Sequence, residues 1–143
     1  MNIDDLEFRT GDWETLAPYA APLRAAVFIE EQSVPEDLEW DGIDDECLHV
    51  VALTPDGTCV ATARLTTDEH IGRMAVHPDW RGRGVGLAML ERLVGLARER
   101  DYTRLALAAQ VQAQAFYAKL GFEAYGDVFD DAGIPHRMMA RDL

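Results

Sequence analysis

The segment of the sequence with the clearest chemical potential is a glycine-rich turn, Arg81-Gly82-Arg83-Gly84-Val85-Gly86. It follows a short apolar run that ends at Val76, and a stretch with helical periodicity comes after it. Three glycines at alternate positions leave backbone N–H groups uncovered. At the start of a helix, such groups and the helix dipole together attract an anion such as a pyrophosphate. The turn therefore predicts a binding site for a phosphate-bearing ligand.

Two common phosphate-binding patterns do not fit this turn. A Walker loop requires Gly-x-x-x-x-Gly-Lys-Ser/Thr, and the turn contains no lysine. A dinucleotide fingerprint requires Gly-x-Gly-x-x-Gly directly after a strand. Here the spacing is Gly-x-Gly-x-Gly, and the apolar run ends five residues before Arg81. The alternative without a ligand is a turn that only starts a helix.

A second informative segment, Ala109–Phe122, contains Gln110 and the run Phe116-Tyr117-Ala118-Lys119-Leu120-Gly121-Phe122. A tyrosine, whose ordinary pKa lies near ~10, can donate a proton to a departing thiolate. Tyr117 is therefore a candidate general acid. The alternative is that its side chain packs, or bonds a ligand, without transferring a proton.

Together the two segments resemble the GNAT family of N-acetyltransferases, whose acyl-CoA signature is Arg-x-x-Gly-x-Gly. The run Arg73–Pro78 and the Phe-Tyr-x-Lys-Leu-Gly-Phe core are also similar to that family. The family usually has Asn where Gln110 stands, and Gln offers the same amide one carbon farther out. A narrower resemblance, to the ElaA-like and YjcF-like branch, covers nearly the whole chain and rests on Val27–Gln32, Val34-Pro35, Glu36, Asp41, Asp44, His49, Ala109-Gln110 and Gly133–His136.

The resemblance implies a GNAT fold, which is a mixed, mostly antiparallel α/β sheet of six to seven strands flanked by helices, in one domain over residues 1–143. The sheet is expected to splay between Ile71–Val76 and Arg104–Ala108, so that the pantetheine arm of acetyl-CoA pairs with the first of these strands. A backbone N–H near Ala75 or Val76 would polarise the thioester carbonyl. The residues that the resemblance assigns to the cofactor are Met74, Ala75, Val76, Arg81, Gly82, Arg83, Gly84, Val85, Gly86, Gln110, Phe116 and Tyr117.

The implied activity is direct attack of an amine on the acyl carbon in a ternary complex, with Tyr117 as the general acid and without a metal. The base that deprotonates the ammonium remains open between Glu31, Asp44, His49 and His136. Histidine changes protonation near neutral pH, whereas a carboxylate needs burial to act there. Each candidate also has a structural alternative, as a surface ion pair, a core histidine or a loop anchor, and a water chain could replace any of them. An acyl-CoA-binding sensor without turnover is the alternative to an enzyme.

The charge distribution bears on the acceptor. The formal net charge is −13, and residues 1–60 contain 15 acids against Arg9 and Arg24. Such a protein repels nucleic acid. The run Glu30–Glu46 holds nine acids and no base. It is either a solvated face or a field that attracts a cationic acceptor.

Periodicity places these motifs on an α/β arrangement. We expect an edge strand at Ile3–Arg9 and a helix at Trp13–Gln32 with an irregular start at Pro18 and Pro22. Further ranges complete the prediction: strands at Leu48–Leu53, Cys59–Thr66, Ile71–Val76, Arg104–Ala108, Phe122–Tyr125 and Arg137–Arg141, and helices at Gly84–Arg100 and Val111–Leu120.

The remaining features exclude several classes of protein. No apolar run reaches the roughly 20 residues that a membrane span requires, and the acidic start Met1–Asp5 does not resemble a signal peptide, so we expect a cytoplasmic protein. Cys47 and Cys59 are expected to be reduced thiols outside any zinc site. Exposed apolar side chains at Met138-Met139 would allow a homodimer.

Overall fold

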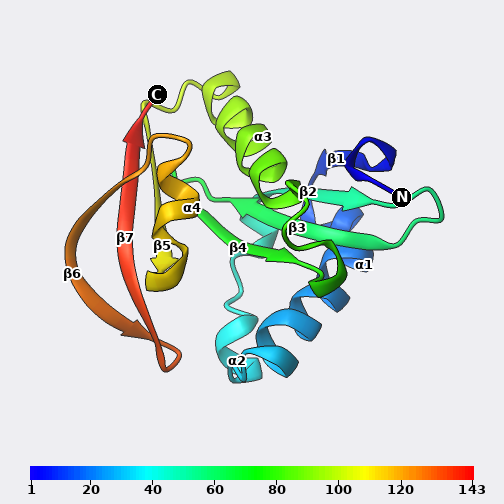
Figure 1. Ribbon diagram of the computed structural model, residues 1–143, viewed down its shortest axis with the longest axis horizontal. Helices are drawn as coiled ribbons and strands as arrows, with labels where there is room; N and C mark the ends of the chain where they lie inside the picture. The colour runs from blue at the N-terminus through cyan, green and yellow to red at the C-terminus, as the bar shows by residue number, and fades with distance from the viewer.

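The seven strands form two antiparallel sheets that separate from each other along one line (Figure 1). The computed structural model describes residues 1–143. The first sheet has the order β1-β2-β3-β4 and the second the order β5-β7-β6. The strands are β1 (Glu7–Gly11), β2 (Leu48–Leu53), β3 (Cys59–Leu65), β4 (Ile71–Val76), β5 (Arg104–Gln110), β6 (Glu123–Asp131) and β7 (Ile134–Asp142).

Strands β4 and β5 meet at one end and diverge at the other. A parallel bridge joins His70 to Ala106, and the N–H of Ala106 donates to the carbonyl of Glu69 at 3.0 Å. Beyond this bridge no ladder pairs β4 with β5, so the two sheets diverge and form a V. The GNAT-type architecture predicted from the sequence is confirmed, with seven strands and a splayed sheet.

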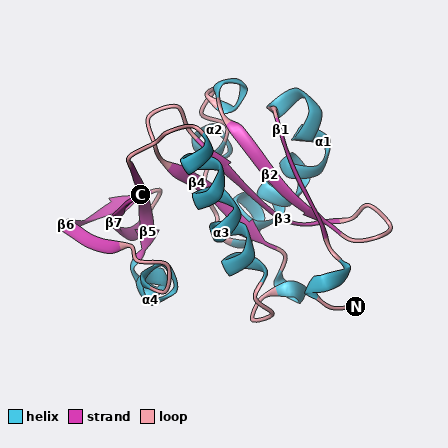
Figure 2. Ribbon diagram, turned by 90° about the horizontal axis from the view of Figure 1, so that it is seen from above, coloured by secondary structure: helices cyan, strands magenta, loops and turns pink.

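Helices cover both faces of the first sheet (Figure 2). Helix α1 packs on one face, while α3 lies on the other and buries Met89, Leu90 and Leu93 completely in the main core. None of the helices combines the length and apolarity that a membrane crossing needs. The α-helices are α1 (Trp13–Arg24), α2 (Glu36–Glu39), α3 (Val85–Glu99) and α4 (Gln114–Ala118), and short 3-10 turns cover Ile3–Asp5, Asp44–Glu46, Pro78–Trp80 and Val111–Ala113.

The first helical stretch ends in a π-helix over Ala25–Glu31. The N–H of Gln32 donates to the carbonyl of Val27, five residues earlier, at 3.1 Å. We predicted irregularity at Pro18 and Pro22, but α1 contains both prolines because its buried face packs against the sheet. The wide turn lies at the C-terminal end instead, and such π segments are frequent at functional sites.

Strand β4 contains a β-bulge. Thr62 pairs with Ala75 and Arg64 pairs with Gly72, so a single residue of β3 faces both Arg73 and Met74. Arg73 adopts a φ of +49°, which a side chain with a Cβ rarely adopts. The bulge sits in the middle of the open edge of the V.

The C-terminal hairpin differs from the prediction. Strands β6 and β7 are longer than expected, and the chain reverses at Ala132-Gly133, where both residues have positive φ. Met138 and Met139 are not an exposed pair: Met139 is 2% exposed in the core, while Met138 lines a cavity. Alternation along β7 explains this, because neighbouring side chains of a strand point to opposite faces. Within this hairpin, the large apolar side chains that are exposed lie on β6 and include Val128 and Phe129.

Candidate active site

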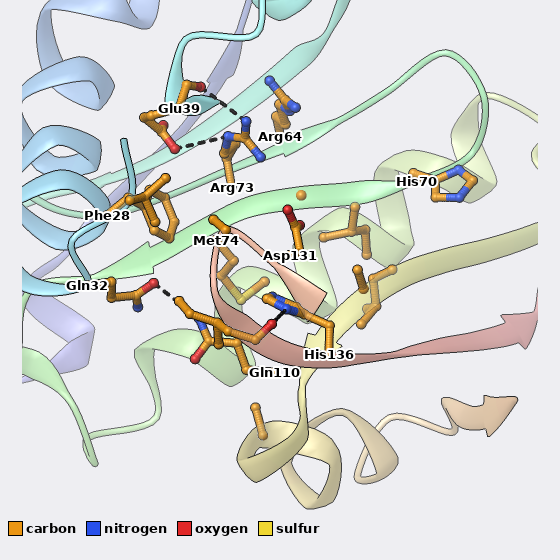
Figure 3. Close-up of a pocket in the computed structure, with 18 of the residues that line it drawn as sticks. Phe28, Gln32, Glu39, Arg64, His70, Arg73, Met74, Gln110, Asp131 and His136 are labelled. Atoms are coloured by element: carbon orange, nitrogen blue, oxygen red, sulfur yellow. Dashed lines mark hydrogen bonds and ion pairs between the residues drawn. The ribbon is translucent and has the colours of Figure 1, made fainter. Parts of the chain in front are cut away.

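A cavity of about 600 Å³ fills the region where the two sheets diverge (Figure 3). Its wall includes Phe28 and Gln32 from the first helical stretch, Met74 from β4, Gln110 from β5 and His136 from β7. The amide of Gln110 donates to the side-chain oxygen of Gln32 at 3.1 Å and so joins the two sides of the V. Elements distant in sequence therefore converge on one site.

The glycine-rich turn leads into α3, as predicted. Gly82 and Gly84 have φ of +75° and +87°, which only glycine adopts without strain, and Gly84 is the N-cap residue of α3. The backbone N–H groups of residues 82–87 donate to no acceptor in the protein. Free amides at the N-terminus of a 15-residue helix form an anion site. The turn thus fits a pyrophosphate.

The two arginines of the turn bond to the protein itself. Arg81 forms two hydrogen bonds to the carboxylate of Glu31, each 2.7 Å long, and its Nε donates to the carbonyl of Val76 at 3.0 Å. The guanidinium of Arg83 stacks 4.8 Å from the ring of Trp80. The backbone amides of the turn therefore stay available to an anion, while Arg81 acts as a brace between the π-helix, β4 and the turn.

The Glu31–Arg81 brace leads to a testable expectation. Replacing Glu31 with Gln should raise the KM for acetyl-CoA roughly two- to five-fold and leave kcat nearly unchanged, because half-exposed ion pairs contribute up to about 1 kcal/mol. Steady-state kinetics with varied acetyl-CoA would measure this, with Glu30→Gln, an unpaired exposed neighbour, as the control. A large loss of kcat at constant KM would instead identify Glu31 as the catalytic base.

The open edge of β4 offers backbone groups to the V. The N–H of His77 donates to the carbonyl of Val60, and hydrogen-bonded pairs alternate along an antiparallel ladder. The next such pair is Ala75 with Thr62, so the N–H of Ala75 points toward β3. The backbone groups of Met74 and Val76 then point into the V. This edge is open to an extended ligand arm, and the pairing of that arm with Met74 and Val76 stays a prediction.

The two cofactor-related motifs are in direct contact. A Cβ on Gly86 would lie 3.2 Å from the ring of Phe116, so glycine allows α3 and α4 to approach closely. Phe116 in turn contacts Tyr117 edge-on, with ring centroids 5.0 Å apart. Tyr117 lines the cavity, and its hydroxyl has no hydrogen-bond partner in the protein. Burial raises the pKa of Tyr117, which keeps the phenol protonated at neutral pH.

His136 also lines the cavity and is 9% exposed. Its Nδ1 lies 2.7 Å from the carbonyl of Ile134, and the ring of Phe129 stacks on it with centroids 5.9 Å apart. A carbonyl accepts only, so Nδ1 carries the proton and Nε2 keeps its lone pair. The ring lines the same cavity as Asp131 and Met74 (Figure 3). His136 is thus a held imidazole with one basic nitrogen free.

The other candidate bases lie outside the cavity. His49 is 1% exposed, its Nε2 lies 2.9 Å from the carbonyl of Asp44, and its ring packs 4.9 Å from that of Trp13. Burial lowers the pKa of His49. The hydrogen bonds from Arg81 lower the pKa of Glu31. The structure therefore brings Tyr117 and His136 together at one site and keeps Glu31 and His49 away from it.

A group of three arginines and three carboxylates, most of them buried, contributes Glu39, Arg64 and Arg73 to one wall of the cavity, and we call it the arginine–carboxylate cluster. Arg24 lies between the rings of Trp13 and Trp40, at 5.1 and 5.0 Å. Its Nε donates to Glu39 at 2.6 Å, and burial raises the pKa of Glu39 against the pull of the arginines. The members of the cluster are Arg24, Arg64, Arg73, Glu39, Asp41 and Asp44.

The cluster changes the interpretation of the acidic run Glu30–Glu46. Glu39, Asp41 and Asp44 are neutralised by arginines of the cluster, and Glu31 is neutralised by Arg81. The run therefore provides much less of an electrostatic field than its nine acids suggest. Sequence analysis did not identify Arg64 and Arg73 as part of the site. The signal available was the string of acids without a nearby base, which needs cations from elsewhere in the chain.

Comparisons with known proteins agree with this geometry. The family model of the acetyltransferase (GNAT) domain matches residues 16–143. The crystal structure of Escherichia coli ElaA superimposes with a TM-score of 0.85 and is 30% identical, covering 94% of this chain and 99% of ElaA. An acyl-CoA N-acyltransferase from Pseudomonas aeruginosa has a TM-score of 0.85 and is 31% identical, covering 95% of this chain and 99% of its own.

A curated sequence relative supports the same assignment. A protein of Bacillus subtilis (strain 168), named as a candidate acetyltransferase, is 33% identical over 128 residues, which are 85% of this chain and 86% of the relative. The residues that the family model matches include α3, the glycine-rich turn and both walls of the cavity. The chain is therefore a member of the GNAT acetyltransferase family and an acyltransferase.

Proposed function

We propose that the protein transfers an acetyl group from acetyl-CoA to a primary amine by direct attack in a ternary complex. The observation that carries this proposal is the convergence of Tyr117 and His136 on one cavity beside the open edge of β4. A phenol that donates a proton and an imidazole that accepts one are the two groups that aminolysis of a thioester requires. Residues 1–143 would act as one domain.

The donor would occupy the V. The free amides of residues 82–87 would bind its pyrophosphate, and the backbone of Met74 and Val76 would pair with its pantetheine arm like an added strand. Gln110 would contact the arm from the other wall through its amide. Acetyl-CoA supplies the activated acyl group when it is bound.

The backbone N–H of Val76 would stabilise the oxyanion that develops when the amine attacks. The N–H of Ala75 points toward β3, so of the two positions expected from the sequence the structure favours Val76. Arg81 holds the carbonyl of the same residue at 3.0 Å, which restrains the backbone of Val76 at this position. A fixed donor of this kind costs no reorganisation during the reaction.

His136 and Tyr117 would move the protons. His136 Nε2 would accept a proton from the acceptor ammonium, and its Nδ1 would stay bonded to the carbonyl of Ile134. The neutral amine would then attack the acyl carbon. The Tyr117 hydroxyl would protonate the departing sulfur, and burial favours its protonated form beforehand. No covalent enzyme intermediate is required.

Replacing His136 with Asn should lower kcat/KM for the amine about 100-fold, because general-base catalysis contributes at least about that factor. Asparagine can still donate to the carbonyl of Ile134 but has no basic nitrogen. Steady-state assays of thiol release would measure the loss, and added imidazole should restore part of the rate in His136→Gly. His49→Asn is the comparison. A loss of kcat/KM in that variant alone would identify the buried His49 as the base.

The activity itself can be tested by following the release of CoA thiol from acetyl-CoA with and without a panel of primary amines. We expect amine-dependent release and a mass increase of one acetyl group on the accepted amine. Tight binding of acetyl-CoA without release across the whole panel would contradict the enzyme and favour a sensor. A cytoplasmic location and a homodimer stay predictions from the sequence.

A further inference from the structure

Arg73 is the partly exposed arginine of the arginine–carboxylate cluster that lines the cavity, and it has unused hydrogen-bonding capacity. Its Nη2 lies 3.0 and 3.1 Å from the carbonyls of Leu38 and Glu39 and 3.1 Å from Asp41, and its Nε lies 3.1 Å from Glu39. Its second terminal nitrogen, Nη1, donates to no protein atom. The side chain lines the cavity and is 25% exposed. A guanidinium keeps its charge at any physiological pH, so Nη1 is a charged donor on a side chain that lines the cavity.

The surrounding structure holds this guanidinium in place. The bulge in β4 and the positive φ of Arg73 fix its backbone, and the cluster fixes its tip. Strained backbone of this kind persists where the surroundings impose it, often at functional sites. A donor fixed in advance loses little entropy when it binds a ligand.

The carboxylates of the same wall are already used. Glu39 also lines the cavity, but one of its oxygens binds Arg24 at 2.6 Å and the other lies 3.1 Å from Arg73. The wall therefore presents a free donor and no free acceptor at this point. An anionic group fits it better than a cation.

The opposite side of the cavity has the complementary charge. Asp131, at the end of β6, lines the cavity, is exposed and forms no ion pair in the protein. Its carboxylate suits an ammonium group. Arg73 and Asp131 thus offer one charge of each sign to a molecule in the cavity.

We propose that the acceptor is an amino acid or a related molecule that carries both a primary amine and a carboxylate, and that Arg73 binds the carboxylate. The inference rests on the transferase activity proposed above. Arg73 precedes Val76 by three residues, and the bulge makes this segment shorter than the roughly 10 Å of three regular strand residues, so several bonds separate the amine and the carboxylate of the acceptor. An ω-amino acid or the C-terminal part of a small peptide meets this description.

Matched pairs of acceptors test the inference on the wild-type protein. The series from glycine to 6-aminohexanoate would be compared, at each length, with the corresponding ω-amino carboxamide, which has the same shape without the negative charge. We expect kcat/KM for the preferred acid to exceed that of its amide by about ten-fold or more, because a charge-assisted hydrogen bond is being compared with a neutral one. Equal values at every length would overturn the inference and leave the transferase activity intact.

Variants of Arg73 locate the effect. Arg73→Gln should reduce the acid-to-amide ratio to near one and keep the kcat/KM of the amide. If the glutamine variant does not fold, Arg73→Lys serves in the same assay, because lysine preserves a positive charge for the cluster. It should lower the acid-to-amide ratio because it lacks Nη1. Arg104→Gln, an exposed arginine on β5, is the control and should keep the wild-type ratio. A ratio that persists in folded Arg73 variants would overturn the role of this residue, and the absence of transfer to every amine would overturn the transferase proposal itself.

Discussion

Replacing Tyr117 with Phe should lower kcat about 100- to 1000-fold and leave the affinity for acetyl-CoA unchanged. Proton donation to a leaving group contributes factors of this size, and the substitution removes only the hydroxyl. Phe keeps the ring contacts with Phe116 and Phe122, whose centroids lie 5.0 and 6.3 Å from that of Tyr117. Stability should therefore not change.

Two measurements separate the effect on chemistry from the effect on binding. Pre-steady-state or steady-state assays give kcat, and calorimetry with CoA gives the affinity. Tyr125→Phe, at an exposed position on β6, is the matched control and should behave like the wild type. If Tyr117→Phe turns over at the wild-type rate, Tyr117 is a packing residue and the leaving thiolate takes its proton from water.

The largest expected effect on stability comes from the arginine–carboxylate cluster. Replacing Arg24 with Met should lower the free energy of unfolding by about 3–5 kcal/mol, because it leaves buried carboxylates without their cation. Arg24 is 1% exposed and bonds to Glu39 and Asp44, so methionine fills the space but restores neither bond. The contacts with the rings of Trp13 and Trp40 also lose their cation. Urea unfolding followed by circular dichroism would measure the loss.

Arg9→Met provides the control for this prediction. Arg9 also pairs with a carboxylate and lies over a tyrosine ring, but its pair with Glu7 is exposed to solvent. Exposed pairs are screened by water, so its replacement should leave the unfolding midpoint nearly unchanged. Similar losses of stability in both variants would show that the contribution of the cluster to stability does not depend on its burial.

Acid titration gives a second readout of the same cluster. The hydrogen bond and charge of Arg64 lower the pKa of Asp41 to about 2, below its ordinary value of 3.8. A group whose pKa is lower in the folded state contributes stability that is full above about pH 4 and is lost as the pH falls through about 2. Asp44 shifts in the same direction, because the bonds from Arg24 and Arg64 outweigh the effect of burial. The urea concentration at the midpoint of unfolding should therefore decrease as the pH is lowered from 4 to 2.

Local patterns were sufficient to predict most of the fold. The strand Ile71–Val76 and the helix from Val85 lie where alternation and periodicity placed them. The glycine-rich turn and the second motif, Ala109–Phe122, set the positions of the elements that bring Tyr117 and His136 to one cavity. Long-range pairing is what the sequence does not reveal. Glu31 is a candidate base in the sequence, and the sequence does not show that it pairs with Arg81, fifty residues away along the chain.

The other differences have the same origin. His49 resembles a catalytic histidine in the sequence, but β2 is a central strand of its sheet, so its side chains are buried by α1 and the neighbouring strands. The sequence did not indicate where the guanidinium of Arg73 points. Its orientation depends on the bulge in β4 and on remote groups in Leu38–Asp41. Short-range rules identify which residues can do chemistry, and packing decides which of them face the site.

The open edges of β4 and β5 bear on how the protein avoids aggregation. An unpaired strand edge is a template on which a strand of another molecule can grow, and proteins usually cover or charge such edges. Here the two edges face each other inside the V and join at the bridge between His70 and Ala106. An approaching sheet cannot enter so narrow a space, whereas a single extended chain can. The same divergence that admits a thin ligand therefore protects the fold from self-association at these edges, and only β1 and β6 remain as outer edges.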